Sequence, residues 1–574
     1  MRKGNRIYGI IATLLLSLGA CSLIHDDMEE LGYREDGSAY AYVSLTIHTG
    51  TTGNVTRSNP TGGEAGDGYE DGQTYENAVS NLTLFFYPAT LGDGGVNRDN
   101  VNFTAKVYIT NPDPNWNMED GTQPIDKTFT VGPVKVEGLK TNQQYHVLAV
   151  ANAGDKTNIS SLDALREAII STVYTATTST EGTSTEGATS YSNFVMASEG
   201  DEHPELDISY ENSETNPAET TINLERLVAR VDYQVGDNAD TDFEIDGRQI
   251  TASITRAFLV NTYNQDTYVL KRVATDIGET PEYLGKETYN NYVIDPHTSA
   301  KTLDAASTNA SWYDHYFPGL NDGNSEEWES WLIVGDEVKD PDTQEAWLRL
   351  GYPKENTSSV DAQGKYYSTG VVFEARYDFG EGLREETFFL VNGTTLYATL
   401  EEAMEAHNNN KFEENRSFSS YADLQKYIED ILKDNDPAGY KAFLQEATEQ
   451  TDLALLTWAN YKTNQLGYTE GKPTATTRKE LHDRVTGPNK TETFLNGRGY
   501  YTYWIRHNYG DKDNVVSGLP MENAIVRNNI YKLTVRSIKE IGNDVPGDKT
   551  LDILVAVAKW NLLDEENIDL EPTN

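Results

Sequence analysis

Apolar and polar residues alternate strictly in one segment near the start of the chain. Ala41, Val43, Leu45 and Ile47 are apolar, and the residues between them are serine, threonine or tyrosine. A period of two places alternate side chains on opposite faces of a β-strand. The pattern therefore predicts a strand at residues 40–48 with one buried face.

Most of the remaining chain repeats this kind of pattern. Short apolar or alternating runs are separated by stretches rich in Gly, Asn and Asp, which is typical of strands joined by turns. These runs lie at residues 79–87, 145–151, 221–235, 254–260, 267–273, 371–377, 388–397, 500–505, 525–538 and 551–557. The Asn392-Gly393 dipeptide is a hairpin turn signal.

Helical spacing is rarer than strand spacing. It occurs at residues 162–174, and two more helices are predicted at residues 420–432 and 438–457. An acidic, glycine-bounded segment at residues 237–247 indicates a domain boundary. We expect a mainly β fold with two antiparallel β-sandwich-like (transthyretin-like) domains and a few helices, mostly in the second domain.

The N-terminus reads as a targeting signal. A basic head precedes a short apolar stretch at residues 10–18, which is too short to span a bilayer. Leu18-Gly19-Ala20-Cys21 follows and resembles a bacterial lipobox, which implies cleavage before Cys21 and lipid on its thiol. The alternative is an ordinary secretory peptide with a cysteine there by chance. The acidic residues just after Cys21 resemble a surface-export signal of Bacteroidota lipoproteins, or form a solvated tether.

Four segments follow from these patterns. We expect a signal peptide at residues 1–20, a tether with a removable first strand at 21–57, an N-terminal β domain at 58–236 and a C-terminal β domain at 237–574. The last domain ends in an apolar strand at 551–557.

Composition narrows the possible functions. The 574 residues include 91 acidic and 46 basic ones, a net charge of −45 that repels phosphate and anionic lipid, so nucleic acid and anionic membrane surfaces are poor partners. The single cysteine rules out an internal disulfide. The nine histidines form no zinc-binding spacing, and no nucleophile elbow or phosphate loop occurs, so an enzyme is not supported. We expect no cofactor.

Two acidic clusters are candidate binding sites for calcium. Asp237, Asp240 and Asp242 form the first cluster, and residues 321–324 form the second. Neither follows the register of an EF-hand loop. We therefore interpret both as solvated loops and expect no metal site.

The two ends of the chain have one common explanation. The terminal run at 551–557 is apolar on both faces, and such a strand needs cover on both sides. Arg57 is the one basic residue of the Gly-rich segment 50–72 that follows the first strand. A protease that cuts there would free the first strand, and a strand from a second molecule could fill the groove. The alternative for Arg57 is a plain loop arginine.

Several further motifs occur along the chain. They are Leu224-Glu225-Arg226-Leu227-Val228-Ala229-Arg230-Val231, Glu386-Thr387-Phe388-Phe389, the run from Ala524 to Val535, Ser537-Ile538-Lys539, and the closing strand with Trp560 and Ile568-Asp569-Leu570. Together these motifs resemble the fimbrillins, the major subunits of Bacteroidota type V pili, and within them the shaft protein of the short (minor, Mfa-type) fimbrium.

The resemblance implies an assembly route. A precursor anchored in the outer membrane through Cys21 would be cut between Arg57 and Ser58 by an arginine-specific protease. The first strand, with Ala41, Val43, Leu45 and Ile47, would then leave. The C-terminal strand of a neighbouring subunit would replace it through Leu551, Ile553, Val555 and Val557. The implied partners are copies of the chain itself and accessory and anchor pilus subunits.

Two positions depart from this family pattern, and two other functions stay open. Ser58-Asn59-Pro60 stands where an alanine is commoner after the arginine, and Asp552 interrupts the donor strand. One alternative is an accessory or tip subunit of the same pilus. The other is an outer-membrane glycan-binding lipoprotein, for which residues 500–504 (Tyr-Tyr-Thr-Tyr-Trp) are the candidate surface, although their alternation favours an ordinary sheet strand.

Overall fold

The structure is a computed structural model, and only part of the chain is described below. The described residues are 39–49, 69–89, 101–112, 128–178, 189–199, 204–277, 291–302, 331–339, 345–364, 367–398, 402, 416–420, 422–423, 426–427, 491–507, 510–511, 514–515, 518–544, 546–547 and 549–561. Cys21, Arg57 and Ser58 lie outside these residues.

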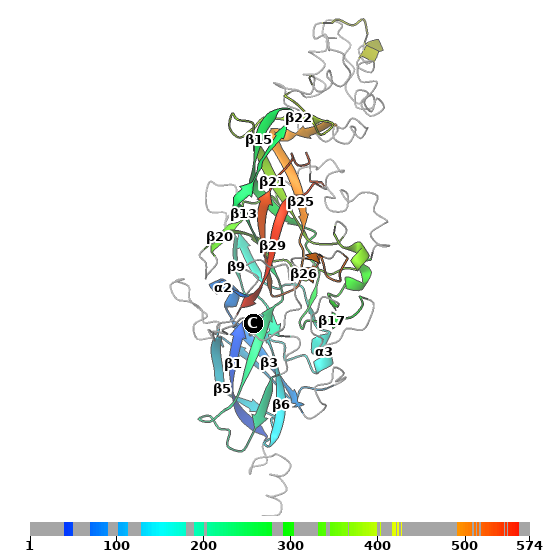
Figure 1. Ribbon diagram of the computed structural model, residues 1–574. Helices are drawn as coiled ribbons and strands as arrows, with labels where there is room; N and C mark the ends of the chain where they lie inside the picture. Colours follow the sequence, from blue (N-terminus) through cyan, green and yellow to red (C-terminus); the bar gives the residue numbers. More distant parts are fainter. Residues whose placement is uncertain are drawn as a thin grey trace, which may run out of the picture.

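The N-terminal part of the molecule is built on an eight-stranded sheet (Figure 1). In spatial order its strands are β4 (Ala105–Thr110), β3 (Asn81–Pro88), β6 (Gln143–Ala151), β10 (Met196–Ser198), β12 (Ala218–Arg226), β1 (Tyr40–Thr49) and β5 (Thr128–Glu137), and β11 (Glu205–Ile208) also pairs with β6. Apolar side chains from one face of these strands, including the alternate residues of β1, form one core. We call this the first sheet.

Two further sheets form the C-terminal part, at the other end of an elongated molecule (Figure 1). The second sheet consists of β19 (Asp336–Lys339), β20 (Ala346–Gly351), β13 (Arg230–Asp240), β28 (Asn529–Ser537), β29 (Asp552–Asn561) and β2 (Tyr69–Asp71). The third sheet consists of β14 (Asp242–Ile245), β15 (Arg248–Val260), β21 (Gly370–Asp378) and β25 (Arg498–Trp504). Buried side chains from both sheets share one core, as in a β-sandwich.

Smaller elements complete the described part. The small sheets are β23 (Thr395–Tyr397), β22 (Phe388–Val391) and β24 (Thr491–Phe494); β16 (Thr267–Tyr268) with β7 (Ile169–Ile170); β17 (Val273–Ala274) with β18 (Tyr292–Val293); β26 (Gly510–Asp511) with β27 (Asn514–Val515); and β8 (Thr175–Thr178) with β9 (Thr189–Ser192). The helices are α2 (Thr74–Asn77) and α3 (Leu162–Arg166), with 3₁₀ turns at Thr298–Ala300, Val360–Ala362 and Leu495–Gly497.

The predicted mainly β fold with sandwich-like packing and few helices is confirmed. Most strand pairs are antiparallel, but β1–β12, β13–β28 and β2–β29 are parallel. The helices predicted at 420–432 and 438–457 fall mostly outside the described residues. The predicted helix at 162–174 is wrong beyond Arg166, because Ile169 and Ile170 instead pair with β16 as a strand.

The chain changes sheets earlier than the boundary at 236/237 that we drew from the sequence. We predicted one strand over 221–235, but β12 ends in the first sheet at Arg226 and β13 begins in the second at Arg230. Residues 227–229 between them are fully buried, so the run stays apolar through the crossing and its periodicity does not mark the change. The acidic residues 237–247 belong to β13, β14 and their turns.

Candidate strand-exchange site

Strand β1 fills an inner position of the first sheet. It runs parallel to β12 from the pair Val43–Ala218 to the pair Thr49–Leu224, and antiparallel to β5 from Tyr40–Glu137 to His48–Thr128. Because both edges of β1 are paired, its loss would leave unpaired backbone on two neighbours and a gap within the sheet. We call this gap the β1 slot.

The inner face of β1 is dry. Ala41, Val43, Leu45 and Ile47 are at most 1% exposed and lie in the core of the first sheet. Burial of each larger apolar side chain is worth about 1.5–3 kcal/mol. A strand that fills the slot with apolar residues at every second position is therefore strongly stabilised, and an empty slot exposes apolar surface.

A bulge in β5 shapes the middle of the slot. The β1–β5 register shifts between Val43 and Leu45, and Gly132 lies opposite this shift with a φ of 122°. A Cβ on Gly132 would lie 2.6 Å from the Val43 carbonyl oxygen. Only glycine combines this φ with so close an approach of the two backbones.

A buried polar cluster closes the C-terminal end of the slot. Its members, which we call the Arg226 cluster, are Arg226, Thr49, Glu76, Asn77 and Asn528. The guanidinium donates from Nη2 to the Thr49 carbonyl at 3.3 Å, from Nε to the Glu76 carbonyl at 2.9 Å and from Nη1 to the Asn528 Oδ1 at 3.3 Å, and Nη2 also donates to Asn77. Arg226 thus joins β1 to α2 and to the turn before β28.

The charge of Arg226 lies in a poorly solvated place. The side chain is fully buried. Burial lowers the pKa of its guanidinium to about 10, although Glu76 opposes this shift and Arg230 adds to it. Arg226 is therefore still charged at neutral pH and relies on nearby acceptors in place of water.

A buried ion pair ties α2 to β13 of the second sheet, and a second one lies within β13. Arg230 lies 3.1 Å from Glu76 and 2.9 Å from Asp232, and all three side chains are at most 1% exposed. Tyr352 also donates from its hydroxyl to Glu76. The sequence analysis quoted Arg226 and Arg230 only as part of a motif; two arginines inside an apolar run were the signal that could have marked them.

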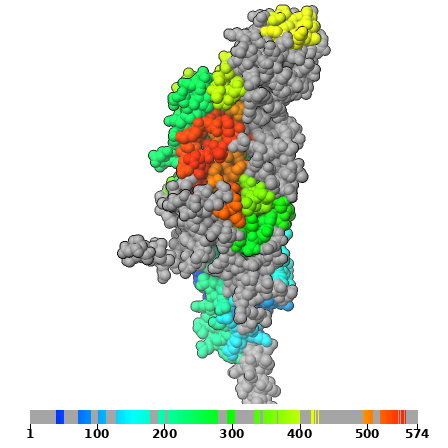
Figure 2. All heavy atoms as spheres, turned by 45° about the vertical axis from the view of Figure 1, so that its right-hand side comes forward, coloured from blue at the N-terminus to red at the C-terminus, as the bar shows by residue number. Residues whose placement is uncertain are grey.

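The predicted donor segment forms a strand of its own sheet. Strand β29 pairs antiparallel with β28, from Ser537–Asp552 to Asn529–Lys559, and parallel with β2 over three residue pairs. Leu551, Ile553 and Val555 are 4–9% exposed and lie in the core between the second and third sheets. Val557 pairs with Tyr531 through the backbone. Figure 2 shows the C-terminal residues, in red, at the surface on one face of the molecule.

Asp552, which interrupts the apolar pattern of the donor segment, lies in a wet and paired place. Its side chain is 50% exposed and lies 2.7 Å from Arg536.

In the sequence, the predicted cleavage point lies between β1 and β2. Residues 50–68, which include Arg57 and Ser58, connect β1 in the first sheet to β2 on the outer edge of β29. A cut after Arg57 would therefore separate β1, which fills the slot, from β2, which pairs with β29.

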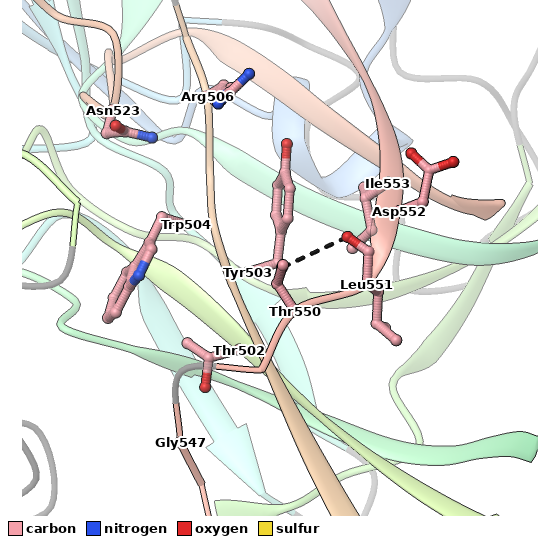
Figure 3. A pocket seen from close by; sticks show the side chains of 10 residues that line it. All are labelled: Thr502, Tyr503, Trp504, Arg506, Asn523, Gly547, Thr550, Leu551, Asp552 and Ile553. Carbon is pink, nitrogen blue, oxygen red and sulfur yellow. Dashed lines mark hydrogen bonds between the residues drawn. The ribbon is translucent and has the colours of Figure 1, made fainter. Parts of the chain in front are cut away.

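The aromatic run at 500–504 lies on β25, an edge strand of the third sheet. Tyr500 and Tyr501 are buried, whereas Tyr503 and Trp504 line a cleft of about 440 Å³ beside the start of β29. In Figure 3 the two rings point to opposite sides of β25. Tyr503 packs on the core between the second and third sheets, and Trp504 packs on a different cluster. The rings thus do not form one flat platform for a sugar.

The acidic loops offer no assembled metal site in the part of the chain that the structure describes. There, no three His, Cys, Asp or Glu side chains are grouped as metal ligands. Asp240 pairs with Lys539, and residues 321–324 lie outside the described ranges. Nor does any helix among the described residues have the length and apolar character needed to cross a membrane.

Comparisons with solved structures give distant likenesses. A fimbrilin from Porphyromonas gingivalis is 12% identical with a TM-score of 0.33, covering 92% of this chain and 99% of its own. Two proteins with a suggested cell-adhesion role are similar to the same degree. The one from Parabacteroides distasonis is 13% identical with a TM-score of 0.33, and the match covers 92% of this chain and 98% of the other. The one from Bacteroides eggerthii is 11% identical with a TM-score of 0.33, and the match covers 91% of this chain and 96% of the other. Likeness at this level carries no information on function.

The C-terminal sequence gives the sharper result. A comparison with curated proteins finds no matching relative. Residues 492–566 match the family model described as "Major fimbrial subunit protein type IV, Fimbrillin, C-terminal", a stretch that includes β25, β28 and β29. The resemblance to the fimbrillins is thereby confirmed, through the match of residues 492–566 to the C-terminal fimbrillin model.

Proposed function

We propose that the chain is the repeating shaft subunit of a cell-surface fimbria and that it polymerises by strand exchange. The precursor is anchored in the outer membrane by lipid on Cys21. An arginine-specific protease cuts between Arg57 and Ser58, and β1 leaves its slot. Residues 551–557 of a neighbouring copy then fill the slot, with accessory and anchor subunits at the fibre ends. The fibre supports adhesion and biofilm formation.

The observation that carries this proposal is the position of β1. A strand that precedes an arginine-containing connection would usually be expected at a sheet edge, where its loss costs least. Here it lies between β12 and β5 with a fully buried face. Its removal would create a slot that only another strand can fill.

The spacing of apolar residues supports the same exchange. Ala41, Val43, Leu45 and Ile47 occupy every second position of β1, and Leu551, Ile553, Val555 and Val557 do so in the predicted donor. A donor that runs in the direction of β1 would therefore place four apolar side chains in the four dry positions. A slip by one residue would turn all four outward.

The energetics favour a slow exchange over a tight equilibrium. In the monomer, β29 already pairs with β28 and buries Leu551, Ile553 and Val555. Donation moves the strand from the second sheet of its own subunit to the first sheet of a neighbour. The net free energy gained is therefore the difference between two similar stabilisations. Persistence of the fibre then rests on the slow departure of a strand paired on both edges.

The test is the N-terminus of protein recovered from the cell surface. We expect sheared fibres to begin at Ser58. An Arg57→Ala variant should accumulate as lipidated monomers, seen as loss of fibres by electron microscopy, whereas Arg98→Ala should assemble normally. Normal fibres from Arg57→Ala would contradict the proposal.

A deletion of residues 551–574 is a poor test, because it removes core side chains of the second sheet. The other two functions would give different outcomes. A tip or accessory subunit would be cut at Ser58 but appear once per fibre, and a glycan-binding lipoprotein would stay uncut and bind polysaccharide as a monomer.

A further inference from the structure

The apolar face of the β1 slot does not account for all of the contacts of β1. The C-terminal end of β1 also gives a backbone carbonyl, that of Thr49, to the buried guanidinium of Arg226 at 3.3 Å. Thr49 is itself fully buried, two residues beyond the last apolar position at Ile47. This contact does not depend on the identity of any side chain in the filling strand.

The members of the Arg226 cluster fall on two sides of the predicted cut. Glu76, Asn77 and Asn528 follow residue 57 in the chain and would stay with the processed subunit. The Thr49 carbonyl belongs to the segment that would leave. Departure of β1 therefore withdraws a backbone acceptor from a fully buried, charged donor.

A filled slot buries the Arg226 guanidinium again, and a buried charged donor without an acceptor is costly. The strand that refills the slot restores this bond only if it reaches the place of Thr49. We infer that Arg226 is a recognition residue of the slot, which binds the backbone of the incoming strand two residues beyond its apolar side chains. This inference rests on the proposed function and adds a length requirement to it.

The requirement extends the donor segment. Thr49 pairs with Leu224 of β12, and Ile47 pairs with Ile222. If Val557 takes the place of Ile47, the residue at the place of Thr49 is Lys559. Residues 558 and 559 thus belong to the donor for their backbone, although the apolar spacing alone ends it at 557.

The experiment uses the full chain after cleavage at Arg57 and labelled synthetic peptides, with binding measured by fluorescence anisotropy. Three peptides copy β1: residues 39–49 ending in a carboxamide, the same peptide ending in threoninol, which lacks the Thr49 carbonyl, and residues 39–47. Two peptides copy the tail: residues 549–559 and 549–557. The threoninol peptide needs no change to the protein, so the test does not depend on a variant that folds.

We expect the carboxamide peptide 39–49 to bind at least tenfold more tightly than the threoninol peptide, which corresponds to about 1.4 kcal/mol. Peptide 549–559 should likewise bind more tightly than peptide 549–557, by a similar factor. In an Arg226→Met chain both ratios should fall below threefold, and Arg226→Lys should restore part of them, whereas a merely structural role of Arg226 would leave both ratios unchanged.

The outcomes separate the two claims. Equal binding of the carboxamide and threoninol peptides to the cleaved chain would overturn the role of Arg226 while leaving strand exchange intact. Length dependence of the β1 peptides without binding of either tail peptide would support Arg226 and overturn the assignment of the donor. If no peptide binds, the slot does not open after cleavage, and both the proposed function and this inference are wrong.

Discussion

The strands β1 and β29 are both apolar at alternate positions, yet the two sheets hold them differently. Strand β1 lies inside the first sheet with a long partner on each edge, β12 and β5. Strand β29 has one long partner, β28, and on its other edge, among the described residues, three residue pairs with β2. The inner side chains of β1 are at most 1% exposed, whereas Ile553 and Val555 of β29 are 9% and 4% exposed.

This difference matches the parts that a receiver and a donor must play. A strand near an edge can peel off by giving up one long ladder, and the rest of its sheet stays paired. A strand inside a sheet leaves a slot with two unpaired edges, which holds a replacement from both sides. A fimbrial subunit therefore gains most from a removable inner strand and a transferable outer strand, as we propose for this chain.

Truncation of one buried side chain in each strand should give the largest effect. Leu45→Ala in β1 should lower the free energy of unfolding of the uncut chain by about 2–5 kcal/mol, because the surrounding sheet cannot collapse into the cavity. Ile553→Ala in β29 should lower it by about 2–3 kcal/mol. This is close to the free energy of transferring the removed side-chain atoms to water, with little added cost for a cavity. Urea denaturation followed by tyrosine and tryptophan fluorescence measures both.

The control for this pair is Thr46→Ala on the outer face of β1, which should change the stability by less than about 0.5 kcal/mol. A larger loss for Ile553→Ala than for Leu45→Ala would contradict the comparison of the two strands.

Acid should weaken the third sheet through Glu374 of β21, whose hydrogen-bond partners lie on the neighbouring strand β15. Burial tends to raise the pKa of Glu374, but hydrogen bonds from Arg256, at 2.8 and 3.1 Å, and from Thr255 outweigh burial and hold this pKa below its ordinary value. The stabilisation is therefore complete above pH about 4.5 and is lost as the pH falls through the lower folded-state pKa.

Glu374→Gln should cost about 1–3 kcal/mol at pH 7 and much less at pH 3, because the neutral amide has no ionised form to lose. Urea midpoints at the two pH values measure this, with the exposed Glu381→Gln as control. An equal cost at both pH values would show that the ionised carboxylate is not what stabilises this sheet.

The smallest effect is expected at Asp552, the one charged residue of the predicted donor segment 551–557. Its pair with Arg536 is half-exposed, and such pairs contribute about 0–1 kcal/mol. Asp552→Asn should therefore shift the urea midpoint only slightly and leave fibre yield unchanged. A loss above about 2 kcal/mol would mean that the outer face of β29 is not exposed to solvent as described.

The sequence patterns correctly predicted those elements that a short stretch of residues determines by itself. The alternation around Val43 and Leu45 marked β1 within one residue at its C-terminal end, and the Asn392-Gly393 turn joins β22 to β23 with both residues at positive φ. The terminal run was found as well, although β29 extends to Asn561. In each case one buried face, or a turn that needs a positive φ, sets the pattern.

What the sequence did not predict depends on distant partners. Ile169 fits a helical face on spacing alone, but it is 51% exposed in a strand that pairs with residues about a hundred positions away. The acceptors of Arg226 are equally remote, because Glu76 and Asn528 lie 150 and 302 residues from it in the chain. No periodicity in the neighbourhood of Arg226 carries that information.

The separation of the slot from the tail determines what kind of object the subunits can build. The two surfaces belong to different sheets of one molecule, so a single contact between the C-terminal strand of one copy and the slot of another is not self-complementary. Contacts of this heterologous kind continue from copy to copy unless a rotation closes them into a ring. A filament assembled in the proposed way would therefore have direction: one end would offer an empty slot and the other an unused C-terminal strand, so growth and termination would be chemically distinct events at the two ends.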